Sequence, residues 1–204
     1  DYAIDEKMFF QFLESTQKDS LDAYKAYNKN DWKQKILGRF DKLIKKHGIA
    51  YMLKKGMALD EQHFHFMYPC PLASSSQSVK QNFASNIFSV TRQVQYSLKN
   101  RREEIDMIIF LNGLPLVTME LKNAWTNQTA RYHGQKQYRE DRDPTQPLLT
   151  PARCLVHFAV DTDEVYMTTK LEGKKTYFLP FNKGTASGGQ GNPVNPNGYK
   201  TAYL

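Results

Sequence analysis

The sequence predicts an α/β (α+β) fold: a mixed β-sheet flanked by helices, with a helical extension at the N-terminus. Through the first quarter of the chain, apolar residues recur at the spacing of amphipathic helices. After Gly56 the pattern changes to the apolar–polar alternation of strands, and the strand pairs are separated by one helical segment. The order is therefore a group of helices, two strands, one helix and two more strands. This order indicates helices that pack in a layer on a sheet.

The chain divides into three expected segments. Residues 1–60 are expected to form a helical extension packed on the core, and residues 61–183 the core itself. The last segment, 184–204, is rich in Gly, Asn and Pro, which is typical of a flexible linker into a further domain. With 204 residues, the chain is long enough for one core and a small helical subdomain. It begins at Asp1 without an initiator methionine, so we expect a fragment of a longer protein.

Four helices are expected in the extension. Apolar residues at helical spacing define the first three, and these are Phe9, Phe10, Phe12 and Leu13, then Leu21, Tyr24 and Tyr27, then Trp32, Ile36, Leu37, Phe40, Leu43 and Ile44. Gly48 ends the third helix, and a short fourth helix covers 49–55 and stops at Gly56.

The elements of the core follow from alternation and from turn residues. Expected strands lie at 63–67, 87–96, 153–160, 163–170 and 176–181, expected helices lie at 78–85 and 129–141, and a hairpin spans 103–122. Pro144 limits the helix at 129–141, because the residue before a proline is disfavoured in the helical conformation.

The composition is that of an ordinary globular protein, with 40% hydrophobic and 24% charged residues. No apolar run is long enough to span a bilayer, so no membrane partner is expected. Two cysteines, Cys70 and Cys154, are too few for a disulfide framework and favour a reduced, cytoplasmic setting. The net charge of +7 favours a polyanionic partner. Residues 33–55 are densely basic, and Lys45 and Lys46 are candidate nucleic-acid contacts; a solvated helix face is the alternative.

The hairpin at 103–122 carries three ionisable residues inside apolar strands: Asp106, Glu120 and Lys122. Burying such charges is costly unless they are paired or bind a metal. We expect Asp106 and Glu120 to bind Mg²⁺, with the Leu121 carbonyl as a further ligand. Lys122 would orient the attacking water and stabilise negative charge at a scissile phosphate. These residues predict a metal-dependent phosphodiesterase; the alternative is an edge strand whose Glu and Lys face solvent.

The loop of this hairpin decides whether the three side chains can meet. With a two-residue turn at Asn112-Gly113, Asp106 would face the opposite side of the sheet from Glu120. With a three-residue loop in which Gly113 is left-handed, Asp106, Glu120 and Lys122 share one face. We therefore expect the three-residue loop, although Asn-Gly by itself favours the shorter turn.

Other side chains are weaker candidates. On the helix at 129–141, Gln135 and Tyr138 are candidates to hydrogen-bond the DNA backbone or stack on a base; ordinary surface residues are the alternative. His63 and His65 lie on one strand face, but no third zinc-type ligand is near in sequence, so we expect surface histidines. No glycine-rich phosphate-binding motif occurs, so no nucleotide site is expected.

Several segments carry a resemblance to a known family. They are 86–93, 112–123 (Asn-Gly-Leu-Pro-Leu-Val-Thr-Met-Glu-Leu-Lys-Asn), 141–148, 178–184 and 191–196. Together they closely resemble the N-terminal region of the restriction (R) subunit of type I restriction–modification enzymes, over nearly the whole chain. The resemblance implies a PD-(D/E)xK nuclease domain ahead of an ATP-driven DNA translocase. Asp106, Glu120 and Lys122 match the acid, Glu and Lys of that motif.

The resemblance also implies partners and cofactors. It implies an Mg²⁺-dependent endonuclease domain that cuts double-stranded DNA without sequence readout of its own, together with modification and specificity subunits. ATP would be used only by the motor of the full-length subunit. The family often carries Gln and Tyr four residues apart; Gln135 and Tyr138 are three apart, whereas Gln128 and Tyr132 have the family spacing. Members of the family begin with an acidic helix, and in this protein that helix would lie upstream of Asp1. A stand-alone RecB-like repair nuclease and a non-catalytic nucleic-acid-binding module are the alternatives.

Overall fold

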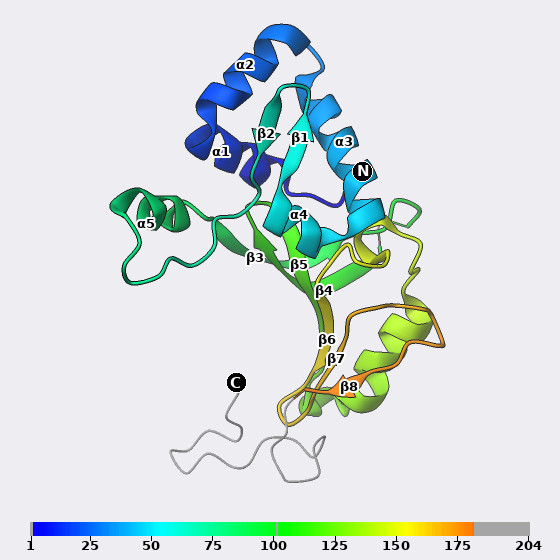
Figure 1. Ribbon diagram of the computed structural model, residues 1–204. Coiled ribbons are helices and arrows are strands. Elements are labelled where there is room, and N and C mark those ends of the chain that lie inside the picture. Colours follow the sequence, from blue (N-terminus) through cyan, green and yellow to red (C-terminus); the bar gives the residue numbers. More distant parts are fainter. Residues whose placement is uncertain (1, 101, 182–204) are drawn as a thin grey trace. The chain divides into compact units, whose positions relative to one another are not determined.

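The computed structural model describes residues 2–100 and 102–181 (Figure 1). The described chain forms two compact units. The first contains the residues up to Val90 together with Ile109–Leu116, and the second contains Thr91–Ile108 and the described residues from Val117 onward. The expected boundary near residue 60 therefore falls inside the first unit. The expected linker at 184–204 lies outside the described residues.

Several helix ends of the first unit are marked by capping residues. The helices are α1 (Glu6–Thr16), α2 (Lys18–Asn28), α3 (Trp32–His47), α4 (Ile49–Lys55) and α5 (Gln77–Ala84). The Asp5 carboxylate accepts a hydrogen bond from the Met8 N–H and caps α1. Gly48 and Gly56, with φ of 79° and 69°, end α3 and α4. The four expected helices are confirmed.

The strands form a two-stranded ribbon and a mixed sheet. They are β1 (Met57–Leu59), β2 (Gln62–Phe64), β3 (Phe88–Gln95), β4 (Glu104–Leu111), β5 (Leu114–Leu121), β6 (Val156–Val160), β7 (Val165–Thr168) and β8 (Leu179–Pro180). Within the described part, the sheet has the order β3-β4-β5-β6-β7-β8. β5 and β6 are parallel, whereas β6, β7 and β8 pair antiparallel. The expected mixed α/β fold is confirmed, but β1 was not predicted and β8 is shorter than expected.

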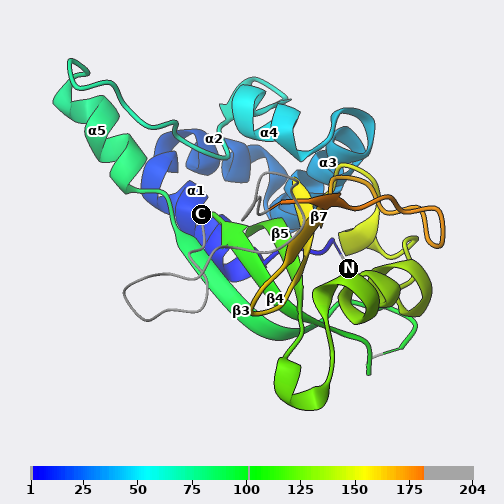
Figure 2. The same ribbon diagram turned by 90° about the horizontal axis from the view of Figure 1, so that it is seen from below.

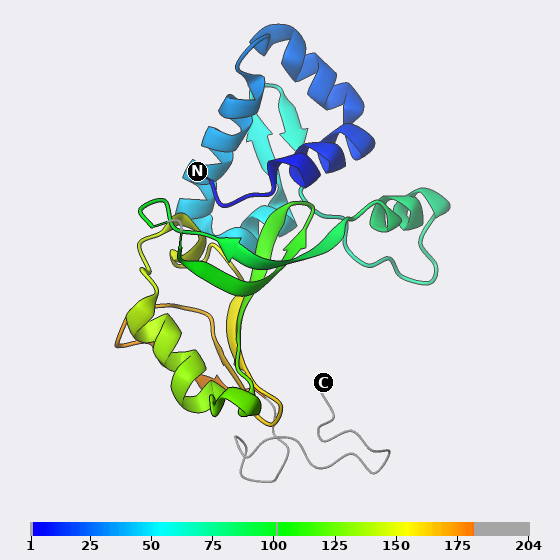
Figure 3. The same ribbon diagram turned by 180° about the vertical axis from the view of Figure 1, so that it is seen from behind.

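The first unit has its own aromatic core. α2 and α3 lie along the β1–β2 ribbon (Figures 1 and 3). The ring of Phe66 stacks on Phe9 at 5.6 Å and meets Phe40 edge-on at 4.9 Å between centroids. Such rings bury large apolar areas, and these contacts hold the helices on the ribbon. By contrast, α5 lies apart from α1–α4 (Figure 2), and none of its described residues is buried.

The tip of the β4–β5 hairpin is a two-residue turn, so the expected three-residue loop is wrong. Only Asn112 and Gly113 separate the strands, and both are left-handed, with φ of 52° and 77°. This turn follows the right-handed twist of the flanking strands. The buried Asn112 side chain further fixes it, accepting from the Ile87 N–H at 2.6 Å and donating to the Phe66 carbonyl at 2.9 Å. Asn-Gly therefore keeps its usual local preference.

The regular alternation of buried side chains is interrupted within β4. Buried side chains along this strand are Ile105, Ile108, Phe110 and Leu111, so the two-residue period of a regular strand is not kept. Although the turn has two residues, Asp106 reaches the same site as Glu120. Its Oδ2 accepts from the Leu121 N–H, and its charge raises the pKa of Glu120.

The connection from β5 to β6 carries the helix of the second unit. Its pieces are η1 (Ala124–Thr126), two π-helical stretches, η2 (Ala130–Gly134) and η3 (Gln137–Asp141), and η4 (Pro147–Leu149). The helix lies against β6 and β7 (Figure 3). A Cβ on Gly134 would lie 2.9 Å from the Ala159 Cβ, so the absence of a side chain permits this close approach. In the described part of the chain, no helix combines the length and apolarity needed to cross a membrane.

Candidate functional site

The second unit brings Asp106, Glu120 and Lys122 together at the ends of β4 and β5. The Lys122 Nζ lies 3.8 Å from the Asp106 Oδ2, and its side chain is only 6% exposed. The same Asp106 oxygen accepts a hydrogen bond from the Leu121 N–H at 2.8 Å. The Lys122 N–H donates to the Val160 carbonyl at 2.7 Å, which continues the β5–β6 pairing past the end of the strand. Acid and amine are thus fixed by the backbone of three neighbouring strands.

Glu120 is fully buried in this site. Its Oε1 accepts a hydrogen bond from the Arg142 Nε at 2.8 Å. Its Oε2 is also buried and has no hydrogen-bond partner among the described residues. Burial raises the pKa of Glu120 to about 7, although the hydrogen bond and charge of Arg142 oppose this shift; the charge of Asp106 adds to it. A buried carboxylate oxygen without a donor is a position where a cation would replace the missing partner.

Each of the two acids is held through one oxygen. The Leu121 N–H donates a hydrogen bond to the Asp106 Oδ2, and the Arg142 Nε donates one to the Glu120 Oε1. Two carboxylates of this kind match the ligands of Mg²⁺, which keeps several waters and takes one or two protein carboxylates. Over residues 2–100 and 102–181, no group of three or more His, Cys, Asp or Glu is placed to hold a metal ion. The residues present therefore fit a hydrated Mg²⁺ better than a structural zinc ion.

Arg142 is a site residue that the sequence analysis missed. It follows the last turn of η3, which ends at Asp141, and it lies 22 residues beyond Glu120. Its guanidinium carbon also lies 5.8 Å from the centre of the Tyr96 ring, as in a cation–π contact. Its sequence neighbourhood, 141–148, was one of the segments that carry the family resemblance. No spacing rule links that segment to β5, so only the fold reveals the pairing.

A buried polar network lies behind the site. Thr118, two residues before Glu120 on β5, is hydrogen-bonded to the Tyr138 hydroxyl at 2.8 Å and to the His157 Nδ1 at 2.7 Å. All three side chains are buried. Burial raises the pKa of Tyr138 well above its ordinary value. The network joins β5, β6 and the helix that connects them.

These positions contradict the role expected for Tyr138. Its ring is completely buried, and its hydroxyl is engaged by Thr118, so it has no surface on which a base could stack. Gln135 is buried as well. The pair with the family spacing, Gln128 and Tyr132, is exposed instead, and Tyr132 is 70% exposed. A helix was expected at 129–141 and is present, in part as two π-helical stretches, but Gln135 and Tyr138 lie on its buried side.

His157 gives the folded protein an expected pH dependence. Burial lowers its pKa from 6.5 to about 4, so between these values the unfolded chain binds a proton that the folded chain does not. This stabilisation is complete above pH 6.5 and is lost as the pH falls through the folded value. We expect wild type to lose about 3 kcal/mol of unfolding free energy relative to His157→Gln between pH 7 and pH 4.

Urea unfolding at several pH values measures this difference. The pKa of Glu120 is shifted in the opposite direction, so its contribution is lost as the pH rises through about 7; it is common to both chains and cancels in the comparison. His47→Gln is the matched control, because the exposed His47 meets water in both the folded and unfolded states. A constant difference between wild type and His157→Gln would contradict the assignment.

The two candidate DNA-contacting lysines lie in the first unit. Lys45 and Lys46 stand in the last turn of α3, and both are exposed. The Lys45 Nζ lies 2.6 Å from the Asp41 Oδ2, one helical turn earlier. The Asp41 side chain is largely covered, but the Lys45 side chain is 67% exposed and Lys46 is exposed as well, so both amines are accessible to an anionic partner.

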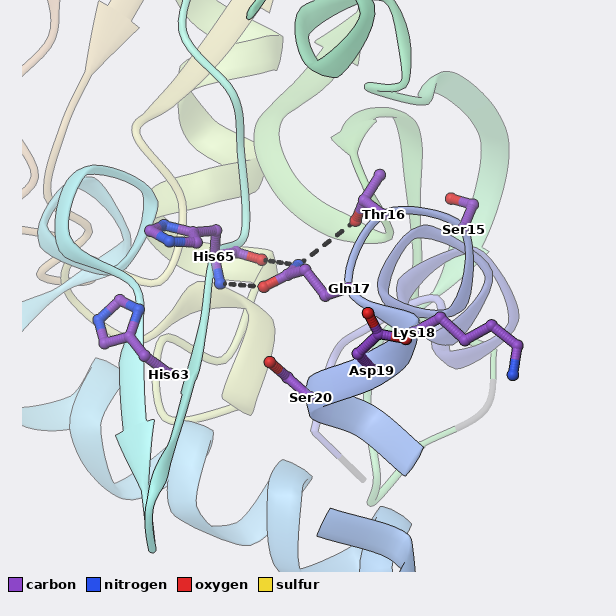
Figure 4. Close-up of a pocket in the computed structure, with 8 residues that line it drawn as sticks. All are labelled: Ser15, Thr16, Gln17, Lys18, Asp19, Ser20, His63 and His65. Atoms are coloured by element: carbon purple, nitrogen blue, oxygen red, sulfur yellow. Dashed lines mark hydrogen bonds between the residues drawn. The ribbon is translucent and has the colours of Figure 1, made fainter. Parts of the chain in front are cut away.

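The first unit also has an open pocket between the α1–α2 junction and the end of β2 with the residue after it (Figure 4). Its volume is about 480 Å³, and His63 and His65 line one side. The two imidazoles are exposed with centroids 4.8 Å apart, which confirms the expected surface histidines. The Gln17 side chain hydrogen-bonds to both the N–H and the carbonyl of His65 and so fixes this wall.

Comparison with known proteins places the chain in a family. The model of the family described as "Type I restriction enzyme R protein N terminus" matches residues 14–176. This match supports a restriction endonuclease role, with a restriction complex and a DNA substrate. Searches among curated proteins and among solved structures gave no match. Because the match covers well over half of the chain, the chain belongs to the N-terminal region of type I restriction enzyme R proteins.

Proposed function

We propose that the second unit is the Mg²⁺-dependent endonuclease domain of a type I restriction enzyme R subunit. It would hydrolyse phosphodiester bonds of double-stranded DNA without sequence specificity of its own. The single observation that carries this proposal is the meeting of Asp106, Glu120 and Lys122, with the Glu120 Oε2 buried and without a donor among the described residues. A carboxylate pair beside an amine, with one buried carboxylate oxygen left without a donor, is suited to phosphodiester hydrolysis.

Each residue has a proposed role. Asp106 and Glu120 would hold Mg²⁺, with the Leu121 carbonyl as a further ligand. When bound, Mg²⁺ supplies positive charge that polarises a phosphoryl oxygen. Lys122 would orient the attacking water and donate hydrogen bonds to the scissile phosphate, where negative charge develops. Its position 3.8 Å from Asp106 keeps the amine beside the cation site without a direct hydrogen bond that would occupy it.

The wider assembly is part of the same proposal. Modification and specificity subunits would select the DNA, and an ATP-driven motor elsewhere in the subunit would couple translocation to cleavage in the cytoplasm. Family membership supports this assembly over a stand-alone RecB-like repair nuclease. The unpaired Glu120 oxygen speaks against a non-catalytic nucleic-acid-binding module, because such a module gains nothing from a buried carboxylate.

Exposed aromatic residues near the site replace Tyr138 as proposed DNA contacts. The indole of Trp125, three residues beyond Lys122, is 97% exposed. The backbone N–H of Trp125 donates to the Asn123 Oδ1 at 2.6 Å, which holds the chain in place at this residue. Tyr132 is 70% exposed on η2. Aromatic rings of this kind stack on bases without regard to sequence, which suits a nuclease that does not read sequence.

Two measurements test the proposed function. Crystals soaked in Mn²⁺ should show an anomalous scattering peak between Asp106 and Glu120. In the complete enzyme with its partner subunits and ATP, plasmid DNA should be cut with Mg²⁺ present and left intact when a chelator removes it. A peak without cleavage would reduce the site to metal binding, and no peak at all would favour the non-catalytic module.

The basic end of α3 gives a separate prediction for DNA binding. Neutralising Lys45 and Lys46 (both →Gln) should weaken binding equally for unrelated duplexes. It should also reduce the magnitude of the slope of log K against log salt concentration by about 2, or about 1 for each lysine. Fluorescence anisotropy of two duplexes over a salt series measures both quantities. Lys18→Gln is the matched control, since Lys18 is an exposed helix lysine paired with Asp22 in the same unit. A loss confined to one sequence would contradict a phosphate-only contact.

A further inference from the structure

We propose that Arg142 is a positioning residue for the metal-binding carboxylate. It occupies the Oε1 of Glu120 and leaves the Oε2 as the single oxygen of that side chain available to a cation. This inference rests on the proposed function, because it assigns a role within the same site. It starts from two observations: the Arg142 Nε donates to the Glu120 Oε1 at 2.8 Å, and the buried Oε2 has no donor among the described residues.

The guanidinium of Arg142 is held from more than one side. Its side chain is only 11% exposed, and its carbon lies 5.8 Å from the centre of the Tyr96 ring. Tyr96 is itself fixed, because its hydroxyl donates to the Glu103 Oε2 at 2.8 Å. A planar cation between an aromatic face and a carboxylate has little freedom to turn. The orientation of Glu120 is therefore imposed by a group that is already in place.

The backbone on each side of Arg142 is also fixed. Its N–H donates to the Gln137 carbonyl at 2.9 Å. The next residue, Asp143, accepts from the Thr145 N–H at 2.9 Å and from the Gln146 Nε2 at 3.0 Å. The end of η3 and the following turn thus form a rigid support for the arginine. Such a support keeps Arg142 in position, and through it the Glu120 carboxylate, whether or not a cation is bound.

This arrangement restricts how Glu120 can bind a cation. A carboxylate with one oxygen engaged by a guanidinium cannot turn both oxygens toward the same ion, so it binds through one. Asp106 is restricted in the same way, since its Oδ2 accepts from the Leu121 N–H. One oxygen from each acid, together with the Leu121 carbonyl, would leave the other ligand positions of Mg²⁺ to water and to substrate. A lysine in place of Arg142 would supply the positive charge, but it lacks the planar guanidinium whose N–H groups point in fixed directions.

Mn²⁺ binding measured by electron paramagnetic resonance tests the proposal on the whole chain. Arg142→Met keeps the length of the apolar stem and should weaken Mn²⁺ binding at least tenfold. Arg142→Lys, which keeps the charge and so protects the fold, should also weaken it, though less. Arg139→Met is the matched control: Arg139 lies on the same helix, donates to the Thr176 carbonyl at 2.9 Å and covers the Phe178 ring, away from both acids.

Each outcome is informative. Thermal unfolding of all three variants separates misfolding from loss of the ion, and Arg142→Lys decides the question if Arg142→Met does not fold. Wild-type affinity in Arg142→Lys would overturn the positioning role. A higher affinity would also overturn it, because Arg142 would then compete with the cation. If wild type itself binds no Mn²⁺, the proposed function fails, which is a distinct result from a failure of the Arg142 assignment.

Discussion

Lys122→Met is expected to lower the rate of DNA cleavage by the assembled enzyme by at least about a hundredfold, since removal of one donor at a developing negative charge costs about 10²–10³ in rate. The side chain is only 6% exposed and lies beside Asp106, so water cannot easily replace the amine. Methionine fills a similar length of stem. It therefore preserves the packing beside Gly134, where a Cβ would lie 3.6 Å from the Lys122 Cγ.

Single-turnover cleavage of plasmid DNA measures the effect, and DNA affinity measured in parallel should change little. Lys136→Met is the matched control, because this lysine is exposed on the following helix and lies 4.0 Å from Glu140. An unchanged cleavage rate in Lys122→Met would remove the amine from the mechanism. Equal losses in both lysine variants would indicate a general effect of charge on DNA binding.

The second large effect is expected at the hairpin tip. Gly113→Ala should reduce the unfolding free energy by about 3 kcal/mol, because a left-handed alanine costs about 1–2 kcal/mol and overpacking adds about 1–3 kcal/mol. Gly113 has φ of 77°, and an added Cβ would lie 2.3 Å from the Asp5 carbonyl oxygen and 2.5 Å from the Phe9 nitrogen. Both neighbours are backbone atoms of α1 or its cap, so they cannot turn away as a side chain would.

Gly38→Ala is a control of opposite sign. Gly38 lies inside α3, and the nearest atom to an added Cβ is the Tyr2 hydroxyl at 3.9 Å, an ordinary contact. Alanine in a helix interior should raise the unfolding free energy by about 0.5–1 kcal/mol. Urea unfolding of both variants measures the pair. A loss below 1 kcal/mol in Gly113→Ala would show that α1 moves away from the turn at little cost.

Local rules predicted the elements wherever the local signal was strong. The bounds of α4, between Gly48 and Gly56, were correct because both glycines adopt the positive φ that ends a helix. The strand β1 was missed because three residues are too short to show an alternation. Asn112-Gly113 forms the two-residue turn that Asn-Gly favours locally, and the three-residue loop that we expected instead was the error.

The candidate site was only partly accessible from sequence. Asp106, Glu120 and Lys122 were found because charged residues interrupt apolar strands, a pattern that needs an explanation wherever it occurs. The reason that they meet was not found, since the irregular burial pattern of β4 has no signature in residue type. Tyr138 was assigned to DNA because it lies with Gln135 on the helix after the lysine strand, and the sequence does not say which side of that helix meets the sheet.

The sequence by itself determined the helices of the first unit, the strands of the sheet and the identity of the three charged residues, because each depends on local spacing or on local chemistry. Only the tertiary structure decided that Arg142 pairs with Glu120 and that Thr118, Tyr138 and His157 form one buried network. These contacts join elements 20 to 39 residues apart. Their cause is the packing of a helix on a parallel strand pair, and packing depends on the three-dimensional shape of both partners, which no single segment of the chain contains.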